Sequence, residues 1–185
     1  MIEQSTVQCA DRAKHQYATC EDFLKIFNED LHGLYQLAFL LTGDHRKGER
    51  CFVTGMENCA KENYVFREWA RAWARRVIVE NAIRELHPRP NHPNSSVHLA
   101  VVSHGQQSDR HFDVDAVLGL ADFERFVFVL CVLESYRERE CALLLGCSTF
   151  EVHEARTRAI EQLATFDQVV STGMKIGGWA EPLKV

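Results

Sequence analysis

Four side chains near the C-terminal end of the chain have types and spacing suited to contact a nucleic acid. They are Thr149, His153, Arg156 and Arg158. A guanidinium group can bind a phosphate or a guanine edge, and a hydroxyl or an imidazole can hydrogen-bond to a base. For His153 a solvated surface position is the somewhat favoured alternative. We take these four as candidate DNA-contacting residues.

Glutamates close to the two arginines offer them another role. Arg156 could pair with Glu151 or Glu154 on its own helix surface. Arg158 could pair with Glu154 or Glu161 in the same way. A carboxylate there would repel a nearby phosphate, although it can accept a hydrogen bond from cytosine. The residues alone leave both roles open.

The element that would position these side chains is a helix-turn-helix. Ala142 is followed four residues later by Gly146, and Val152 comes six residues after that. Helices that cross closely need a small residue where they meet, and glycine tolerates the positive backbone angle of the turn. Such a unit usually places its second helix in the major groove of DNA.

Two S-x-x-E patterns indicate where the helices of this unit begin. Ser135 with Glu138 precedes the first helix, and Ser148 with Glu151 precedes the second. In a capping box of this kind, the serine and the glutamate each satisfy a backbone N–H group at the start of a helix. We therefore expect both serines to be N-caps.

A second basic surface is expected on a helix over residues 65–86. Residues 64–86 carry five arginines and three acidic residues, whereas residues 112–163 carry five arginines and ten acidic residues. Trp69 and Trp73 on this helix could stack on unpaired bases, although the spacing of Trp73 from its apolar neighbours favours core packing. The further candidate DNA-contacting residues are Arg67, Arg71, Arg75 and Arg76.

Hydrophobic periodicity predicts an all-α fold made of two small domains. Expected helices cover about 21–41, 44–61, 65–86, 114–118 and 122–133, followed by the helix-turn-helix. The nearly apolar run at 122–133 could also be a strand, but its length and helical neighbours favour a buried helix. Three of the four prolines lie between the domains. We expect a three-helix domain at 21–86, a linker at 87–111, a second domain at 112–166 and a loosely ordered tail at 167–185.

Composition and charge limit the possible function. The chain of 185 residues is 46% hydrophobic, has a formal net charge of -5, and contains no apolar run long enough to cross a membrane. It has no apolar signal segment near its start, so we expect a cytoplasmic protein. A freestanding DNA-binding protein is usually basic. Either a larger partner assists DNA binding, or that binding is weak or absent.

Cysteine and histidine usage argues against a metal site. The seven cysteines and nine histidines show no zinc-site spacing. In a reducing cytosol most of these cysteines would be small core residues. The histidines of the 87–111 segment could form a pH-sensitive or metal-binding strip, but a solvated linker is favoured. No phosphate-binding glycine loop or organised nucleophile is present. We expect no metal, no cofactor and no enzymatic activity.

The sequence resembles a known family in both halves. The C-terminal matches are Leu120, Glu124-Arg125, Val127 to Leu130, Tyr136, Glu138, Ala142, Leu145-Gly146, Ser148, Val152, Arg158-Ala159 and Leu163. The N-terminal matches are Leu34-Tyr35, Ala38, Leu41 to Asp44, Phe66, Trp69, Ala74-Arg75 and Glu80. In this pattern the chain is similar to the extracytoplasmic-function group of sigma-70-type RNA polymerase sigma factors, with the second sigma region at the N-terminus and the fourth at the C-terminus.

The resemblance implies a transcription initiation factor that binds core RNA polymerase and promoter DNA. It implies contact of the 65–86 helix with the minus-ten element and of the helix-turn-helix with the minus-thirty-five element. An anti-sigma protein could be a further partner. The alternative is a divergent sigma-fold protein that acts as a protein-interaction or regulatory module with weak or no DNA binding. Residues 50–54, which lack the family's Gln-Glu pair, and the glutamates of the second helix favour this alternative.

Overall fold

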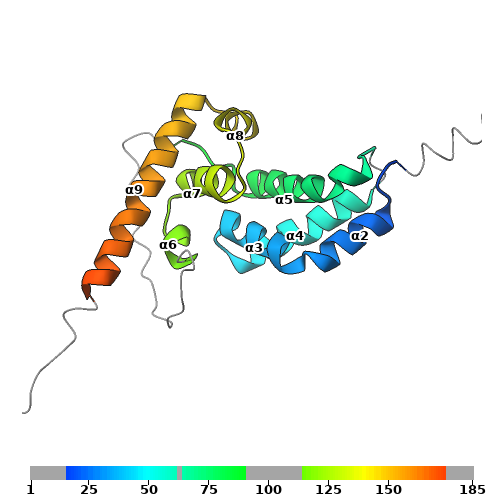
Figure 1. The fold of residues 1–185 in the computed structure, drawn as a ribbon, viewed down its shortest axis with the longest axis horizontal. Helices are drawn as coiled ribbons and strands as arrows, with labels where there is room; N and C mark the ends of the chain where they lie inside the picture. Colours follow the sequence, from blue (N-terminus) through cyan, green and yellow to red (C-terminus); the bar gives the residue numbers. More distant parts are fainter. Residues whose placement is uncertain (1–15, 62–63, 91–113, 174–185) are drawn as a thin grey trace, which may run out of the picture. The chain divides into compact units, whose positions relative to one another are not determined.

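The computed structural model describes residues 16–61, 64–90 and 114–173, and in this part of the chain the fold is all-α, as predicted (Figure 1). The α-helices are α2 (Cys20–Glu29), α3 (Leu31–Thr42), α4 (His45–Ala60), α5 (Ala70–Leu86), α6 (Val114–Leu118), α7 (Asp122–Phe128), α8 (Glu138–Leu145) and α9 (Thr149–Gly173). A 3-10 turn, η1 (Arg67–Trp69), precedes α5, and a π-helical segment, η2 (Val129–Leu133), follows α7. Among the described residues, the only extended pairing is an isolated bridge between Tyr17 and Phe66.

The chain divides into two compact units, Met1–Pro88 and Arg89–Val185. The division falls inside the 87–111 segment that the sequence predicts as a linker. Most of that segment lies outside the described residues. The exact domain limits of 21–86 and 112–166 therefore stay a prediction.

The described residues of the first unit form four α-helices where the sequence predicts three. The single helix expected at 21–41 is wrong, because the chain breaks at Asp30, with φ -111° and ψ 30°. The Asp30 N–H closes α2 on the Ile26 carbonyl, and the Asp30 carbonyl begins α3 by accepting from the Leu34 N–H. The Asp30 side chain makes no cap hydrogen bond, and its carboxylate contacts Arg75 instead. The apolar spacing continues across the break, and this continuity conceals it in the sequence.

Small residues let α4 pack closely on its neighbours. Gly48 is buried, and a β-carbon there would lie 3.2 Å from the Phe39 Cα of α3. Cys51 and Cys59 are buried as predicted, whereas Phe52 is only half-buried. The largest fully buried side chains of this unit are Phe23, Phe27, Leu34, Leu41, Ile78 and Val79.

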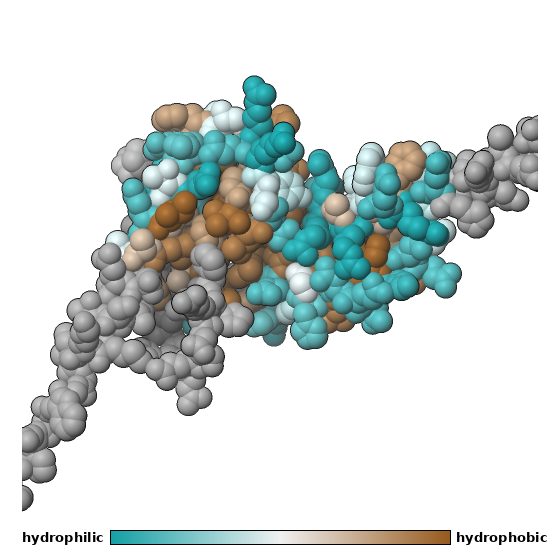
Figure 2. Space-filling view, viewed as in Figure 1, coloured by the Kyte–Doolittle hydropathy of each residue, from teal (hydrophilic) through white to brown (hydrophobic). Residues whose placement is uncertain are grey.

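Two predicted helix starts in the first unit have different outcomes. The helix expected from about residue 44 is present, and the Lys47 N–H donates to the Asp44 carboxylate at 2.9 Å, so Asp44 is the N-cap of α4. The helix expected from residue 65 begins later, at Ala70, because residues 67–69 form the 3-10 turn η1. On the face shown in Figure 2, hydrophilic residues predominate over this unit.

The second unit is built around the apolar run that was ambiguous between helix and strand. It is helical, as predicted, and its last turn is the π-helical η2. Every residue from Phe123 to Leu130 is buried. The helix predicted at 114–118 is present as α6.

The last helix is longer than predicted. The tail expected from residue 167 is wrong over its first residues, because α9 continues to Gly173. Residues 174–185, including Trp179, lie outside the described part. No described helix combines the length and the apolar character that a membrane span requires.

Candidate nucleic-acid interface

The helices α8 and α9 are joined by a tight turn at Gly146. Gly146 has φ 66° and ψ 37°, in the left-handed region that glycine adopts without strain. The Cys147 N–H donates to the Ala142 carbonyl at 3.0 Å, which satisfies a carbonyl at the end of α8. Ala142 and Val152 are both buried, and Gly146 has the positive backbone angle that such a turn requires.

The start of α9 is capped as the sequence predicts. The Ser148 N–H donates to Glu151 Oε2 at 2.7 Å, and the Glu151 N–H donates to Ser148 Oγ at 3.2 Å. These two reciprocal bonds are the capping box. The cap fixes where the helix begins, and it therefore fixes the direction in which Thr149 and His153 project.

The start of α8 differs from the prediction. Ser135 has φ 59° and does not cap a helix with Glu138, because Glu138 is the first residue of α8. The Arg137 N–H donates instead to Glu140 Oε2 at 3.0 Å. The Glu138 carboxylate faces α9, and this contact changes the role of two candidate residues.

Glu138 connects α8 to the candidate DNA-contacting face of α9. Its Oε1 atom lies 3.3 Å from His153 Nδ1 and 3.4 Å from Arg156 Nη1. Arg156 therefore reaches across to a glutamate of the neighbouring helix. The side chain of His153 remains 63% exposed, and Thr149 is also exposed. The first turns of α9 thus present polar side chains to solvent.

Arg158 has a structural partner deep in the second unit. Its Nε and Nη2 atoms lie 3.2 Å and 3.1 Å from Glu124 Oε1 of α7. The Glu124 side chain is only 6% exposed, whereas Arg158 is 41% exposed. Arg158 also contacts Glu154 at 3.7 Å, a pairing that the sequence had left open. A buried carboxylate needs a compensating cation, so Arg158 stabilises the packing of α9 on α7.

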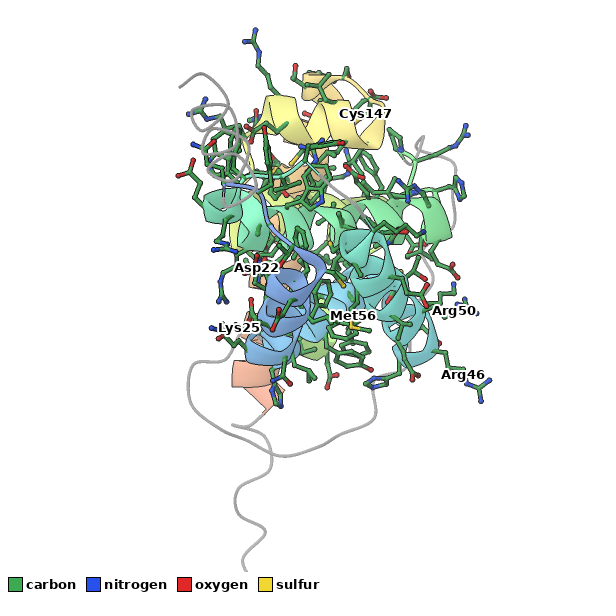
Figure 3. All side chains as sticks on the ribbon, turned by 90° about the vertical axis from the view of Figure 1, so that its right-hand side faces the viewer. Asp22, Lys25, Arg46, Arg50, Met56 and Cys147 are labelled. Carbon is green, nitrogen blue, oxygen red and sulfur yellow. The ribbon has the colours of Figure 1, made fainter. Side chains whose placement is uncertain are left out.

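Three arginines of the first unit contact acidic residues of α2 and of its C-cap, and we call Arg67, Arg71 and Arg75 the arginine row. Asp22, which is labelled in Figure 3, accepts from Arg67 at 2.9 Å through Nη2 and at 3.2 Å through Nε. Arg71 donates to Glu29 at 3.1 Å. The segment from Cys20 to Asp30 carries four acidic residues and one lysine, which more than cancels the excess positive charge of residues 64–86.

The remaining candidate arginines are also paired. Arg75 contacts Asp30 at 3.4 Å, and Arg76 contacts Glu80 of its own helix at 3.0 Å. These side chains are between 31% and 48% exposed. Contacts of this kind at a surface stabilise a fold weakly, so they can exchange for a phosphate at low cost.

The structure lowers the pKa of Asp22, the residue that binds Arg67. Its pKa lies below the ordinary value of 3.8, chiefly because the Thr19 backbone N–H donates to the carboxylate. The Thr19 hydroxyl and Arg67 also favour the charged form, while burial opposes it. The Asp22 carboxylate therefore takes part in the capping box of α2 and also binds Arg67.

The two tryptophans of the arginine segment differ in exposure. Trp73 is half-buried, in keeping with the packing role that its spacing favours. Trp69 is 59% exposed, and its ring meets the Phe66 ring edge-on with centroids 5.4 Å apart. Trp69 is therefore the tryptophan whose indole a base could reach.

Sequence reasoning missed Glu124 and Glu138 as the partners of the candidate arginines. One signal was present, because Glu124 and Arg125 are charged residues at the start of an almost wholly apolar run. A charge in such a run is buried and requires a partner.

Among the described residues, no group of three or more histidine, cysteine, aspartate or glutamate side chains could hold a metal ion.

Comparisons with known proteins give a weak likeness. No family model and no curated protein matches the chain. A chain in the co-crystal structure of the sigma factor RpoE with the anti-sigma factor NepR from Bartonella quintana is similar, with 18% identity and a TM-score of 0.47. The match covers 80% of this chain and 98% of that chain. A likeness of this strength does not assign the chain to a family.

Proposed function

We propose that the chain is a sigma-like transcription initiation factor that binds core RNA polymerase and promoter DNA in the cytoplasm and has no enzymatic activity. The observation that carries the proposal is the α8–α9 unit. Its left-handed Gly146, its buried Ala142 and Val152 and its capped second helix match the requirements of a helix-turn-helix. The exposed Thr149 and His153 lie where a recognition helix meets base edges.

The charge arrangement explains why a larger partner is part of the proposal. The chain has a net charge of -5, and the candidate arginines of both units contact carboxylates. Phosphate contacts supply much of the affinity of a freestanding DNA-binding protein. Core RNA polymerase would supply that affinity here and bring α9 to the DNA. An anti-sigma protein would be a second partner, one that holds the factor away from the polymerase.

The contacts of the candidate residues of α9 support different roles for them. We assign base or phosphate contact to Thr149, His153 and Arg156, because Arg156 is 43% exposed and its contact with Glu138 can exchange for DNA. We assign Arg158 to the packing of α9 on α7 because its partner is buried. A loss of DNA binding in Arg158→Ala would therefore not identify a DNA contact.

The test compares two variants of α9 in complex with core RNA polymerase. Thr149→Ala combined with His153→Ala changes the exposed start of the helix, and Gln162→Ala changes an exposed position further along it. The first should weaken promoter binding by about tenfold or more, since one lost base contact is worth about 1–3 kcal/mol. The Gln162 variant should bind promoter DNA normally, and both should bind core polymerase. Equal promoter affinity of the two variants would contradict the assignment.

A second function is favoured by the pairing of the arginines. If the contacts of α5 with α2 do not exchange for phosphate, the chain is a sigma-fold protein-interaction or regulatory module. It would then form a partner complex that is insensitive to DNA. A salt titration distinguishes the two functions, because a DNA-binding complex loses affinity steeply as salt rises.

A further inference from the structure

Two cysteines of the second unit lie in contact. Cys131 belongs to η2 and Cys141 to α8, and their Sγ atoms are 3.2 Å apart. Both are free thiols. A disulfide requires an S–S distance of about 2.05 Å, so a shift of about one ångström in the side chains would close the bond. Few pairs of thiols in a protein start this close.

The two thiols differ in accessibility and in pKa, and both differences favour oxidation of Cys131 first. Cys141 is buried, whereas Cys131 is partly accessible. The pKa of Cys131 is lowered, chiefly by the hydrogen bond from Cys141, with Arg156 assisting and burial opposing. The pKa of Cys141 is raised by the same bond and by burial. Of the two thiols, Cys131 is therefore the one that forms a thiolate more readily.

A guanidinium stands close to this thiol pair. Arg156 lowers the pKa of Cys131 through its charge, and Glu138, which Arg156 contacts at 3.4 Å, opposes this effect. Positive charge beside the sulfur is a feature of reactive cysteines.

We propose that Cys131 and Cys141 form a redox-active dithiol that a peroxide converts to an intramolecular disulfide. The Cys131 thiolate attacks one peroxide oxygen, which leaves Cys131 as a sulfenic acid and releases hydroxide, protonated to water. The Cys141 sulfur then attacks the Cys131 sulfur, and the sulfenic oxygen leaves with the Cys141 proton as a second water. The two sulfurs lose two electrons in total, and the peroxide gains them. A thiol reductant reverses the change.

The disulfide would join α8 to η2, so that the first helix of the α8–α9 unit becomes covalently attached to the helix before it. The bond closes a loop of about ten residues and restricts the unfolded chain. The dithiol is a property of this unit, and it stands whether or not the proposed function is correct.

Three other described thiols, Cys51, Cys59 and Cys147, provide a contrast. Burial raises the pKa of Cys51 to about 11 and that of Cys59 to about 12, so both remain protonated. Burial also raises the pKa of Cys147, which lies in the turn after α8 (Figure 3). Cys147 is the matched control because it is near Cys141 in the sequence and is half-buried.

The experiment treats the full reduced chain with hydrogen peroxide, blocks the remaining thiols and digests the protein with trypsin. Arg137 and Arg139 lie between the two cysteines, so trypsin separates them unless a disulfide joins the peptides. Mass spectrometry should find the joined pair before reduction and not after. The yield should not depend on protein concentration.

Three variants make the result decisive. Cys147→Ser should keep the joined peptides, because Cys147 lies on the same tryptic peptide as Cys141 and must be excluded as the partner. Cys141→Ser and Cys131→Ser should each lose them, with far-UV circular dichroism confirming that both variants are folded. Two outcomes would overturn the proposal. One is a joined pair that persists in Cys141→Ser, and the other is over-oxidation of Cys131 in the wild-type chain without any joined pair.

Discussion

Replacing Arg158 by alanine should destabilise the second unit more than the loss of any surface ion pair. Glu124 is 6% exposed at its side chain, and both donor atoms of Arg158 lie within 3.2 Å of its Oε1. Removing the partner of a fully buried charge costs about 3–5 kcal/mol, whereas an exposed pair is worth about 0–1 kcal/mol. Because Arg158 itself is 41% exposed, we expect a cost of about 2 kcal/mol in the free energy of unfolding.

The assay is urea unfolding of the full chain followed by far-UV circular dichroism. Hydrogen exchange of α7 and α9 peptides assigns the transition to the second unit, because the two units can unfold separately. The control is Glu154→Gln, which removes only the exposed partner of Arg158 and should cost no more than about 0.5 kcal/mol.

A second substitution tests the cause. Glu124→Gln in the Arg158→Ala background removes the buried charge, so the double variant should be more stable than Arg158→Ala alone. A coupling energy of about 1–2 kcal/mol is expected from the double-mutant cycle. Two results would contradict the packing role of Arg158. One is a loss of unfolding free energy in Arg158→Ala no larger than in Glu154→Gln, and the other is a double-mutant cycle without coupling. Arg158 would then again be a candidate DNA contact.

The same unfolding assay tests three further predictions. Ser148→Ala removes the capping box of α9 and should cost about 1 kcal/mol; an unchanged urea midpoint would show that the cap is not needed. Gly146→Ala places a β-carbon at φ 66° and should cost about 1 kcal/mol, so a more stable variant would contradict the left-handed turn. Asp22 has a lowered pKa in the folded chain, so its contribution to stability is present above its ordinary pKa of 3.8 and is lost as the pH falls through the lowered value. Asp22→Asn should therefore be less stable than wild type at neutral pH, and the difference in urea midpoint should close in acid. A difference that does not change with pH would refute the sign of the shift.

Local signals in the sequence were sufficient for several elements. The helices expected at about 21–41 and 44–61 place the end of α3 and the start of α4 correctly, and Ser148 with Glu151 predicted the cap of α9. These signals act between residues within four positions of each other, so the sequence displays them directly. The break at Asp30 was missed because α2 and α3 both bury apolar residues and the periodicity continues across it.

Contacts between distant residues were not predictable in the same way. Arg158 and Glu124 are 34 positions apart, and Arg67 and Asp22 are 45 apart. The spacing placed the arginines on helix surfaces but did not show which helix would face them. The thiol pair at Cys131 and Cys141 was missed for a different reason, since both residues fit an apolar pattern and were expected to be core residues.

Promoter-directed transcription with core RNA polymerase from the source organism tests the central proposal most directly. The purified chain should form a complex with core enzyme and start transcription at a defined site on a subset of genomic promoter fragments. Thr149→Ala with His153→Ala should abolish that start while leaving the complex with core enzyme intact. A chain that neither associates with core polymerase nor starts transcription on any fragment would contradict the proposed function and would favour the protein-interaction module.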